Sequence, residues 1–327
     1  MKICFVDTTK LNYSYQDIKS EKIRGGESSL INLSKKLSEM GHNVTIFNNT
    51  DKEFFNKKYN WLNLNRIDTN KNNFEVVISN NDTQILSRFK SNKKFVLSHS
   101  LFSFEKAIRK NQLFAYFKNK PTYLLLGKYH KEKMTKIFSL FKSKIITYGV
   151  DEQFQKTPLP STFNKNSSFF ISRQDRNLNI LLDVWKNRVY PKRTISKLYI
   201  TPTKERLEQF NIFNRKMVDR DELIKQIIKS RMIIFPGHKA ELFCIAALEA
   251  SELCIPIITM GIGSLSERVE HGVTGLVSNN TKNFAKNILD MYNDNDMWLE
   301  IRSNLIKKRG ENTWDKAASH FFRILND

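Results

Sequence analysis

Two glutamates eight residues apart mark the segment with the clearest candidate chemistry. In HKAELFCIAALEA, the preceding Pro236 and Gly237 end a run that is typical of a buried strand. Glu241 then falls in the turn before a helix that we expect to begin near Phe243, and Glu249 lies roughly two turns into that helix. Carboxylates at these two places can accept hydrogen bonds from hydroxyl groups on either side of a bound diphosphate.

The start of the same helix is an expected anion site. N–H groups in a first helical turn lack partners and lie at the positive end of the helix dipole, and here they belong to Phe243, Cys244 and Ile245. Ligands of open α/β sheets bind at such strand-to-helix turns. A nucleotide sugar fits, with its sugar near one glutamate and its ribose near the other. Alone, however, two such glutamates are more typical of a solvated helix surface.

Short apolar runs alternate with segments of helical period, which is typical of parallel sheets with crossover helices. The first series predicts strands at 2–7, 43–48, 74–79, 94–99 and 144–149, and a helix at 28–40 that Gly41 ends. The second predicts strands at 167–173, 197–201, 231–237 and 255–261, and helices at 179–188, 221–230, 243–253, 281–294 and 296–325. The polar stretch 151–166 is the expected linker.

The second series resembles retaining glycosyltransferase family 4, which has the GT-B fold. Glu241, Phe243, Glu249 and Ala250 match that family's two glutamates with seven residues between them. Further matches follow at Pro256, Gly263, Glu267, Val269, Gly272, Gly275 and Leu276. The resemblance implies that Glu241 contacts the donor sugar as a catalytic residue and that Glu249 binds the ribose.

Three residues depart from the family pattern. Cys244 and Cys254 stand where glycine is usual, and Ser264 replaces a second glycine. A cysteine carries an energetic penalty where the backbone needs a positive φ. We therefore expect the phosphates to approach this chain differently, and reduced activity is an open alternative.

A basic segment, FFISRQDRNLNILLDVW, adds to the expected donor site. Arg173 and Arg176 match the family's two donor-phosphate ligands, and guanidinium groups bind phosphate oxygens in a bidentate manner. An ordinary surface arginine is the alternative at each position. No Asp-X-Asp motif stands at a strand end. We expect no metal, because these groups and the helix N-terminus can neutralise a diphosphate.

The first half contributes further candidates. Gly25 and Gly26 follow the long polar loop 7–24 and open a helix, and the family's Gly-Gly here lies near the donor phosphate and the acceptor. His99 ends the strand KFVLSH, where the resemblance implies a catalytic histidine facing the donor sugar; a structural histidine is the alternative. IITYGVDEQF resembles the family's interdomain hinge, with Tyr148 in place of an asparagine.

These features predict an α/β chain with the GT-B fold, in which two Rossmann-like α/β/α domains face a central cleft. We expect an acceptor-binding domain at 1–152, a nucleotide-sugar-binding domain at 153–310, and a helix at 311–327 that returns to the first domain. The implied activity is transfer of a sugar, with retention, from a nucleotide-diphosphate sugar to a glycan or lipid-linked acceptor, without a cofactor. A nicotinamide dehydrogenase is disfavoured because no Gly-x-Gly-x-x-Gly follows a strand.

The net charge of +21 over 327 residues suggests a further partner, since such a charge attracts polyanions. Nucleic acid is not expected, because no nucleic-acid-binding pattern is found. Segment 128–144 mixes lysines with apolar residues and suits a basic amphipathic helix on an anionic membrane. The alternative is that its apolar residues pack into the core. Three scattered cysteines and no membrane-spanning run favour a cytoplasmic protein, peripheral at the membrane.

Two other functions remain open. One is a catalytically weak GT-B protein that binds a nucleotide or glycan, which the glycine-to-cysteine departures favour. The other is a protein that binds anionic surfaces through its charge.

Overall fold

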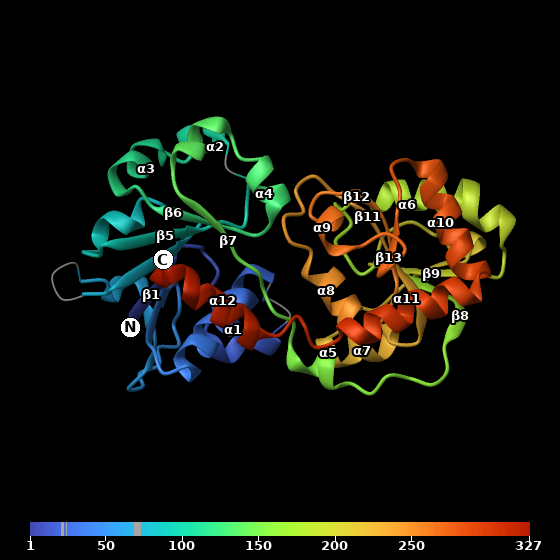
Figure 1. Cartoon of the computed structure of the whole chain (residues 1–327), viewed down its shortest axis with the longest axis horizontal. Helices are drawn as coiled ribbons and strands as arrows, with labels where there is room; N and C mark the ends of the chain where they lie inside the picture. The colour runs from blue at the N-terminus through green and yellow to red at the C-terminus, as the bar shows by residue number, and fades with distance from the viewer. Residues whose placement is uncertain (21–22, 24, 69–72, 102) are drawn as a thin grey trace. The chain divides into compact units, whose positions relative to one another are not determined.

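The computed structural model describes residues 1–20, 23, 25–68, 73–101 and 103–327 (Figure 1). The chain forms two compact units, one of Met1–Gly149 with Trp314–Asp327 (unit 1) and one of Val150–Thr313 (unit 2). The chain therefore passes between units twice, at Gly149/Val150 and at Thr313/Trp314. The sequence instead predicts the two domain boundaries after residues 152 and 310.

Unit 1 is built on a seven-stranded parallel sheet in the order β3-β2-β1-β4-β5-β6-β7. Its strands are β1 (Lys2–Asp7), β2 (Asn43–Asn48), β3 (Tyr59–Asn63), β4 (Val76–Asn80), β5 (Lys93–Leu97), β6 (Thr122–Leu125) and β7 (Ser143–Ile145). Its α-helices are α1 (Gly25–Glu39), α2 (Phe104–Arg109), α3 (Leu113–Asn119), α4 (Lys128–Glu132) and α12 (Trp314–Asn326). α12 packs against α1.

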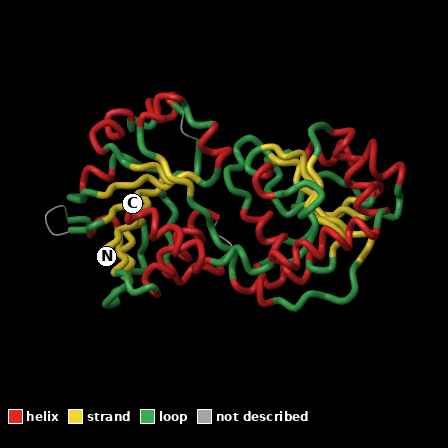
Figure 2. Tube along the Cα trace, in the orientation of Figure 1, coloured by secondary structure: helices red, strands yellow, loops and turns green. Residues whose placement is uncertain are grey.

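Unit 2 repeats this plan with six parallel strands in the order β10-β9-β8-β11-β12-β13. They are β8 (Asn164–Phe169), β9 (Lys197–Ile200), β10 (Ile212–Asn214), β11 (Ser230–Gly237), β12 (Ile257–Ile262) and β13 (Gly275–Val277). The α-helices are α5 (Glu152–Lys156), α6 (Leu178–Val184), α7 (Arg220–Ile227), α8 (Ile245–Glu252), α9 (Leu265–Arg268), α10 (Thr281–Asn293) and α11 (Asn295–Lys308). In Figure 2 the yellow strands of each unit gather at its centre, among red helices.

Both sheets have the strand order of a Rossmann fold, in which the order reverses beside the first strand of the series. The predicted α/β class is confirmed. Parallel strands covered on both faces read as continuous apolar runs, and all eight residues of β11 are buried. Arg231 within that strand is 1% exposed, donates to the Met291 carbonyl (2.8 Å) and stacks on Trp298 at 4.6 Å.

Several element boundaries differ from the prediction. The helix predicted at 296–325 is two helices, because α11 ends at Lys308 and α12 begins at Trp314. The expected linker 151–166 contains α5 and the first residues of β8. The strand predicted at 144–149 ends at Ile145.

The prediction of a basic amphipathic helix over segment 128–144 is wrong. The segment forms α4, a short 3₁₀ helix η4 (Lys136–Leu140) and β7. Phe138 is 1% exposed within the core of unit 1, and Met134, Ile137 and Phe141 pack against the same cluster. Most of its apolar residues therefore face the core, as the alternative interpretation expected. Among the described residues, no helix is long and apolar enough to cross a membrane.

Candidate functional site

In unit 2, three adjacent strands deliver the expected donor-binding residues to one edge of the sheet. β8, β11 and β12 are neighbours and parallel, so their carboxyl ends lie side by side. Arg173 and Arg176 follow β8, Glu241 follows β11, and Gly263 follows β12. The loops are tied together, since the Asn177 amide donates to the Gly237 carbonyl at 2.6 Å. This edge, beside the β8/β11 reversal, is where open α/β sheets bind ligands.

Glu241 lies at the centre of this edge. Its carboxylate accepts from Arg176 Nε at 3.1 Å and from the backbone N–H of Cys244 at 3.3 Å. Its backbone carbonyl accepts from the Ser264 N–H at 2.9 Å. Gly263 has φ +76°, and a Cβ there would overlap the His238 carbonyl, so glycine is required for this approach. The turn therefore holds the Glu241 carboxylate at the start of α8.

The two arginines differ in their surroundings. The Arg176 side chain is 16% exposed and bonds both Glu241 and Asp175. Arg173 is 62% exposed and makes two bonds to Asp175, at 3.1 and 2.7 Å. The Asp175 carboxylate therefore accepts hydrogen bonds from both guanidinium groups. Phosphate oxygens are anionic acceptors with a geometry similar to that of a carboxylate, so these two guanidinium groups are also suited to bind phosphate.

The first turn of α8 has the strained backbone that the sequence predicted. Cys244 is the N-cap residue and has φ 56°, and Cys254, just beyond the helix, has φ 55°. The α-helix begins at Ile245, two residues later than expected. Arg268 donates to the Phe243 carbonyl (2.8 Å) and stacks on its ring at 4.1 Å, which fixes this turn.

Glu249 is the most unusual group of the site. It is 9% exposed, and its carboxylate accepts no hydrogen bond within the described part of the chain. Desolvation raises its pKa above the usual range, and the charge of Arg220 opposes this only in part. An unpaired polar group is costly to bury. Donors from a ligand would offset that cost.

In unit 1, His99 follows β5 with both ring nitrogens hydrogen-bonded. Nδ1 lies 2.8 Å from Asn80 Oδ1 at the end of β4, and Nε2 lies 2.7 Å from the Tyr148 hydroxyl. Since the Asn80 oxygen can only accept, Nδ1 carries the proton and Nε2 accepts from Tyr148. Burial lowers the pKa of His99 to about 4, so the ring is neutral at pH 7. A Cβ on Gly26 would lie 3.8 Å from this ring, so α1 begins against it.

Tyr148, which donates to His99, also lies close to the second point at which the chain crosses between units. The Tyr148 ring lies 5.6 Å from that of Trp314, so residues at the two chain crossings meet within unit 1. Residues 21, 22 and 24 of the polar loop 7–24 lie outside the described residues.

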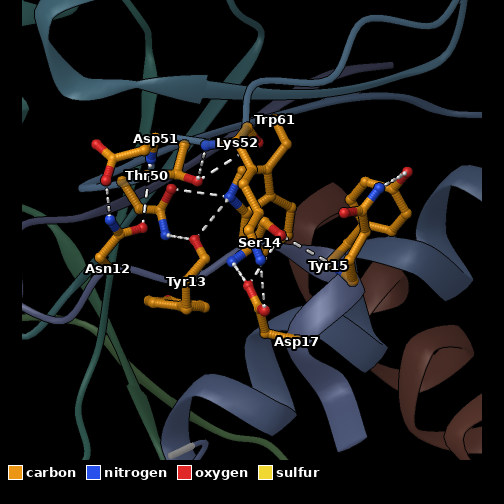
Figure 3. Close-up of polar contacts among 11 residues, drawn as sticks. Asn12, Tyr13, Ser14, Tyr15, Asp17, Thr50, Asp51, Lys52 and Trp61 are labelled. Atoms are coloured by element: carbon orange, nitrogen blue, oxygen red, sulfur yellow. Dashed lines mark hydrogen bonds and ion pairs between the residues drawn. The ribbon is translucent and has the colours of Figure 1, made fainter. Parts of the chain in front are cut away.

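The described part of the loop is held to the sheet (Figure 3). The Tyr13 hydroxyl donates to Asp7 at 2.6 Å, and the Tyr13 carbonyl accepts from the Asn48 amide at 2.7 Å. Trp61 Nε1 donates to Asn48 Oδ1 at 2.8 Å, and Lys52 pairs with Asp17 at 3.1 Å.

The expected site residues therefore fall into two groups. Unit 2 brings Arg173, Arg176, Glu241 and the start of α8 together, with Glu249 further along that helix. Unit 1 brings Gly26 and His99 together. The sequence alone missed Asn80 and Arg268. Asn80 could have been found as a polar residue at the end of a strand, and Arg268 as an arginine that follows the glycine-rich loop.

The architecture places the chain among proteins of the GT-B fold. Sucrose-phosphate synthase from Thermosynechococcus elongatus superposes with a TM-score of 0.72 at 12% identity, covering 99% of this chain and 98% of that one. Anabaena HepE in complex with UDP gives 0.72 at 14%, covering 100% of both. WaaG, a glycosyltransferase involved in lipopolysaccharide biosynthesis, gives 0.69 at 9%, covering 99% of both.

Within that class, residues 203–311 match the family model described as glycosyl transferases, group 1, and the predicted resemblance to this family is confirmed. The matched segment lies wholly in unit 2. No curated protein matches the chain.

Proposed function

We propose that this protein is a retaining glycosyltransferase that moves a sugar from a nucleotide-diphosphate sugar to a glycan or lipid-linked acceptor. The buried Glu249 carboxylate carries the proposal, because no donor among the described residues bonds to it and it lies on the helix that follows the candidate phosphate site. Two ribose hydroxyls would supply the missing donors. The proposal is further supported by HepE, which was solved with UDP.

Donor binding would use groups that are already in place. Arg173 and Arg176 would take the diphosphate oxygens beside Phe243, Cys244 and Ile245 at the start of α8, and Glu241 would hold the sugar hydroxyls. The Cys244 N–H, which donates to Glu241 in the structure, would have to exchange that partner for a phosphate oxygen. This cationic and dipolar set can stabilise the leaving diphosphate without a metal ion or another cofactor. Transfer with retention would break the sugar–phosphate bond while the acceptor oxygen attacks the same face. The acceptor proton would pass to the departing phosphate oxygen.

Unit 1 would supply the acceptor side and a neutral histidine. With Nδ1–H held by Asn80 and a pKa of about 4, His99 cannot serve as a general acid at neutral pH. We propose that its Nε2 orients a sugar hydroxyl in exchange for the Tyr148 hydroxyl. Gly25 and Gly26 would contact the donor phosphate, as the resemblance to the family implies.

Calorimetric titration with UDP, GDP and ADP tests the proposal on the full chain. We expect one of them to bind, and Glu249→Gln to weaken it by about 1.5–3 kcal/mol, the usual value for a hydrogen bond to a charged group. The exposed Glu222→Gln in the same unit is the matched control and should leave affinity unchanged. Binding that Glu249→Gln leaves intact would refute the assigned ribose contact.

A catalytically weak nucleotide-binding protein is the second candidate. It is favoured by the left-handed backbone at Cys244 and by the hydrogen bonds that Glu241 makes to Arg176 and the Cys244 N–H. Hydrolysis of a nucleotide sugar by the purified protein separates the two candidates. Binding without hydrolysis or transfer would select this one. We propose that the protein is cytoplasmic and that it associates peripherally with the membrane.

A further inference from the structure

Unit 1 carries a groove at the edge of its sheet opposite to His99. The groove encloses about 880 Å³ at the amino ends of β5, β6 and β7. The end of α3, the chain after η4 and the last residues of α12 form its walls. Because the strands are parallel, their amino ends and their carboxyl ends lie at opposite edges. Occupation of the groove would leave the candidate site open.

The lining of this groove is strongly basic. Six lysines and one acidic side chain, that of Asp327, line it; the lysines are Lys93, Lys94, Lys118, Lys120, Lys142 and Lys144. Lys93 donates to carbonyls at the end of α12, Lys94 to the Asn119 amide oxygen, and Lys144 pairs with Asp327.

The other three lysines have no such partner. The ammonium groups of Lys118, Lys120 and Lys142 are exposed, and none forms an ion pair or hydrogen bond with any residue the structure describes. Burial is the main cause of the lowered pKa of Lys94, and repulsion from the charge of Lys118 lowers it further. Anionic groups entering the groove would relieve this repulsion.

Exposed apolar side chains stand beside these lysines. Phe114 and Leu140 are each 78% exposed and Phe117 is 45% exposed, although the Phe117 ring packs at 5.5 Å against Phe141. Phe114 and Phe117 share one face of α3, three residues apart. Phe117 and Leu140 line the groove itself. Basic groups beside exposed aromatic and aliphatic side chains suit the boundary between lipid headgroups and acyl chains.

We propose that this groove docks the protein on an anionic bilayer, with lipid phosphates between the free lysines and with Phe114, Phe117 and Leu140 in the interface. The proposal rests on the peripheral membrane association proposed above and gives it a surface. The exposed apolar residues favour a membrane over a soluble polyanion, since a polyanion needs only the charges.

Vesicle co-sedimentation of the full chain tests the groove. We expect binding to vesicles of phosphatidylcholine mixed with phosphatidylglycerol, weak binding to phosphatidylcholine alone, and loss of binding with added salt. The variant K118E/K120E/K142E should lower the partition coefficient by roughly a hundredfold or more, because each basic residue near such a surface contributes about 1 kcal/mol. K204E/K216E/K229E, with the same charge change on exposed lysines of unit 2, is the matched control and should retain most binding.

A second variant separates a membrane from a soluble polyanion. F114S/L140S should weaken vesicle binding while leaving retention on heparin unchanged. Equal partitioning of the two lysine variants, or vesicle binding that F114S/L140S does not reduce, would overturn the proposal. So would heparin binding without vesicle binding. Nucleotide titration of the same samples reports on the donor site separately, so failure there is distinguishable from failure of the groove.

Discussion

Replacing His99 with glutamine should change how the stability of the protein depends on pH. In the folded chain the pKa of His99 is lowered to about 4, mainly because the ring is removed from water, whereas an unfolded histidine titrates near 6.5. Between these values the unfolded state binds a proton that the folded state does not. Stability is therefore full above about pH 7 and falls as the pH drops towards 4.

The size of the effect follows from the two pKa values. At pH 5, an unfolded pKa near 6.5 and a folded pKa of about 4 favour the unfolded state by RT ln[(1 + 10^1.5)/(1 + 10^−1)], which is about 2 kcal/mol. The His99→Gln variant lacks this contribution. Other histidines titrate equally in both proteins, so they cancel in the difference between them.

Urea unfolding of the full chain at pH 7.5 and pH 5 measures that difference. We expect the wild type to lose about 2 kcal/mol more than His99→Gln on acidification. The ring proton resonance of His99 should also stay in its neutral position down to pH 5. A His99 resonance that titrates near pH 6.5, or a stability difference that is the same at both pH values, would refute the assignment of His99 as a neutral ring in the folded protein.

Three further results are expected. Cys244→Gly should be about 1 kcal/mol more stable than Cys244→Ala in urea unfolding, because both remove the thiol but only glycine relieves the positive φ. Equal stabilities would count against backbone strain there. Arg231→Ala should cost about 3 kcal/mol or more, since it leaves buried carbonyls without a donor and opens a cavity, whereas the exposed Arg188→Ala should cost little. Comparable losses for both would contradict this. Nucleotide affinity should fall as the pH is lowered from 7, because the raised pKa of Glu249 brings its protonation closer to neutrality and the protonated acid is a poorer acceptor. A flat calorimetric profile for the wild type, or the same pH dependence in Glu249→Gln, would argue against it.

Local patterns predicted the features that depend on local chemistry. The buried strands β1, β2, β11 and β12 were recognisable as apolar runs, and the glycine positions of the family pattern predicted the positive φ at Cys244 and Cys254. The three-residue strands β10 and β13 were missed because so short a run carries no periodic signal.

Features that depend on tertiary contacts were not predictable in this way. Segment 128–144 has the composition of an amphipathic helix, but burial of Phe138 and pairing of β7 with β6 override the pattern. The partners of His99 come from β4 and from the end of the first crossing, 19 and 49 residues away along the chain. Only the fold brings these side chains together.

The Glu249 carboxylate is expected to aid nucleotide binding and, at the same time, to lower the stability of the ligand-free protein. Replacing it with leucine or methionine should make the ligand-free protein harder to unfold, because a buried acid that no described residue donates to is exchanged for an apolar side chain. The same change would remove the expected ribose contact. Selection for stability alone would therefore favour loss of this glutamate. A screen for more stable variants, run without nucleotide, should recover substitutions at this position. In the presence of a bound nucleotide the same screen should retain the glutamate, since the ligand then supplies the missing donors.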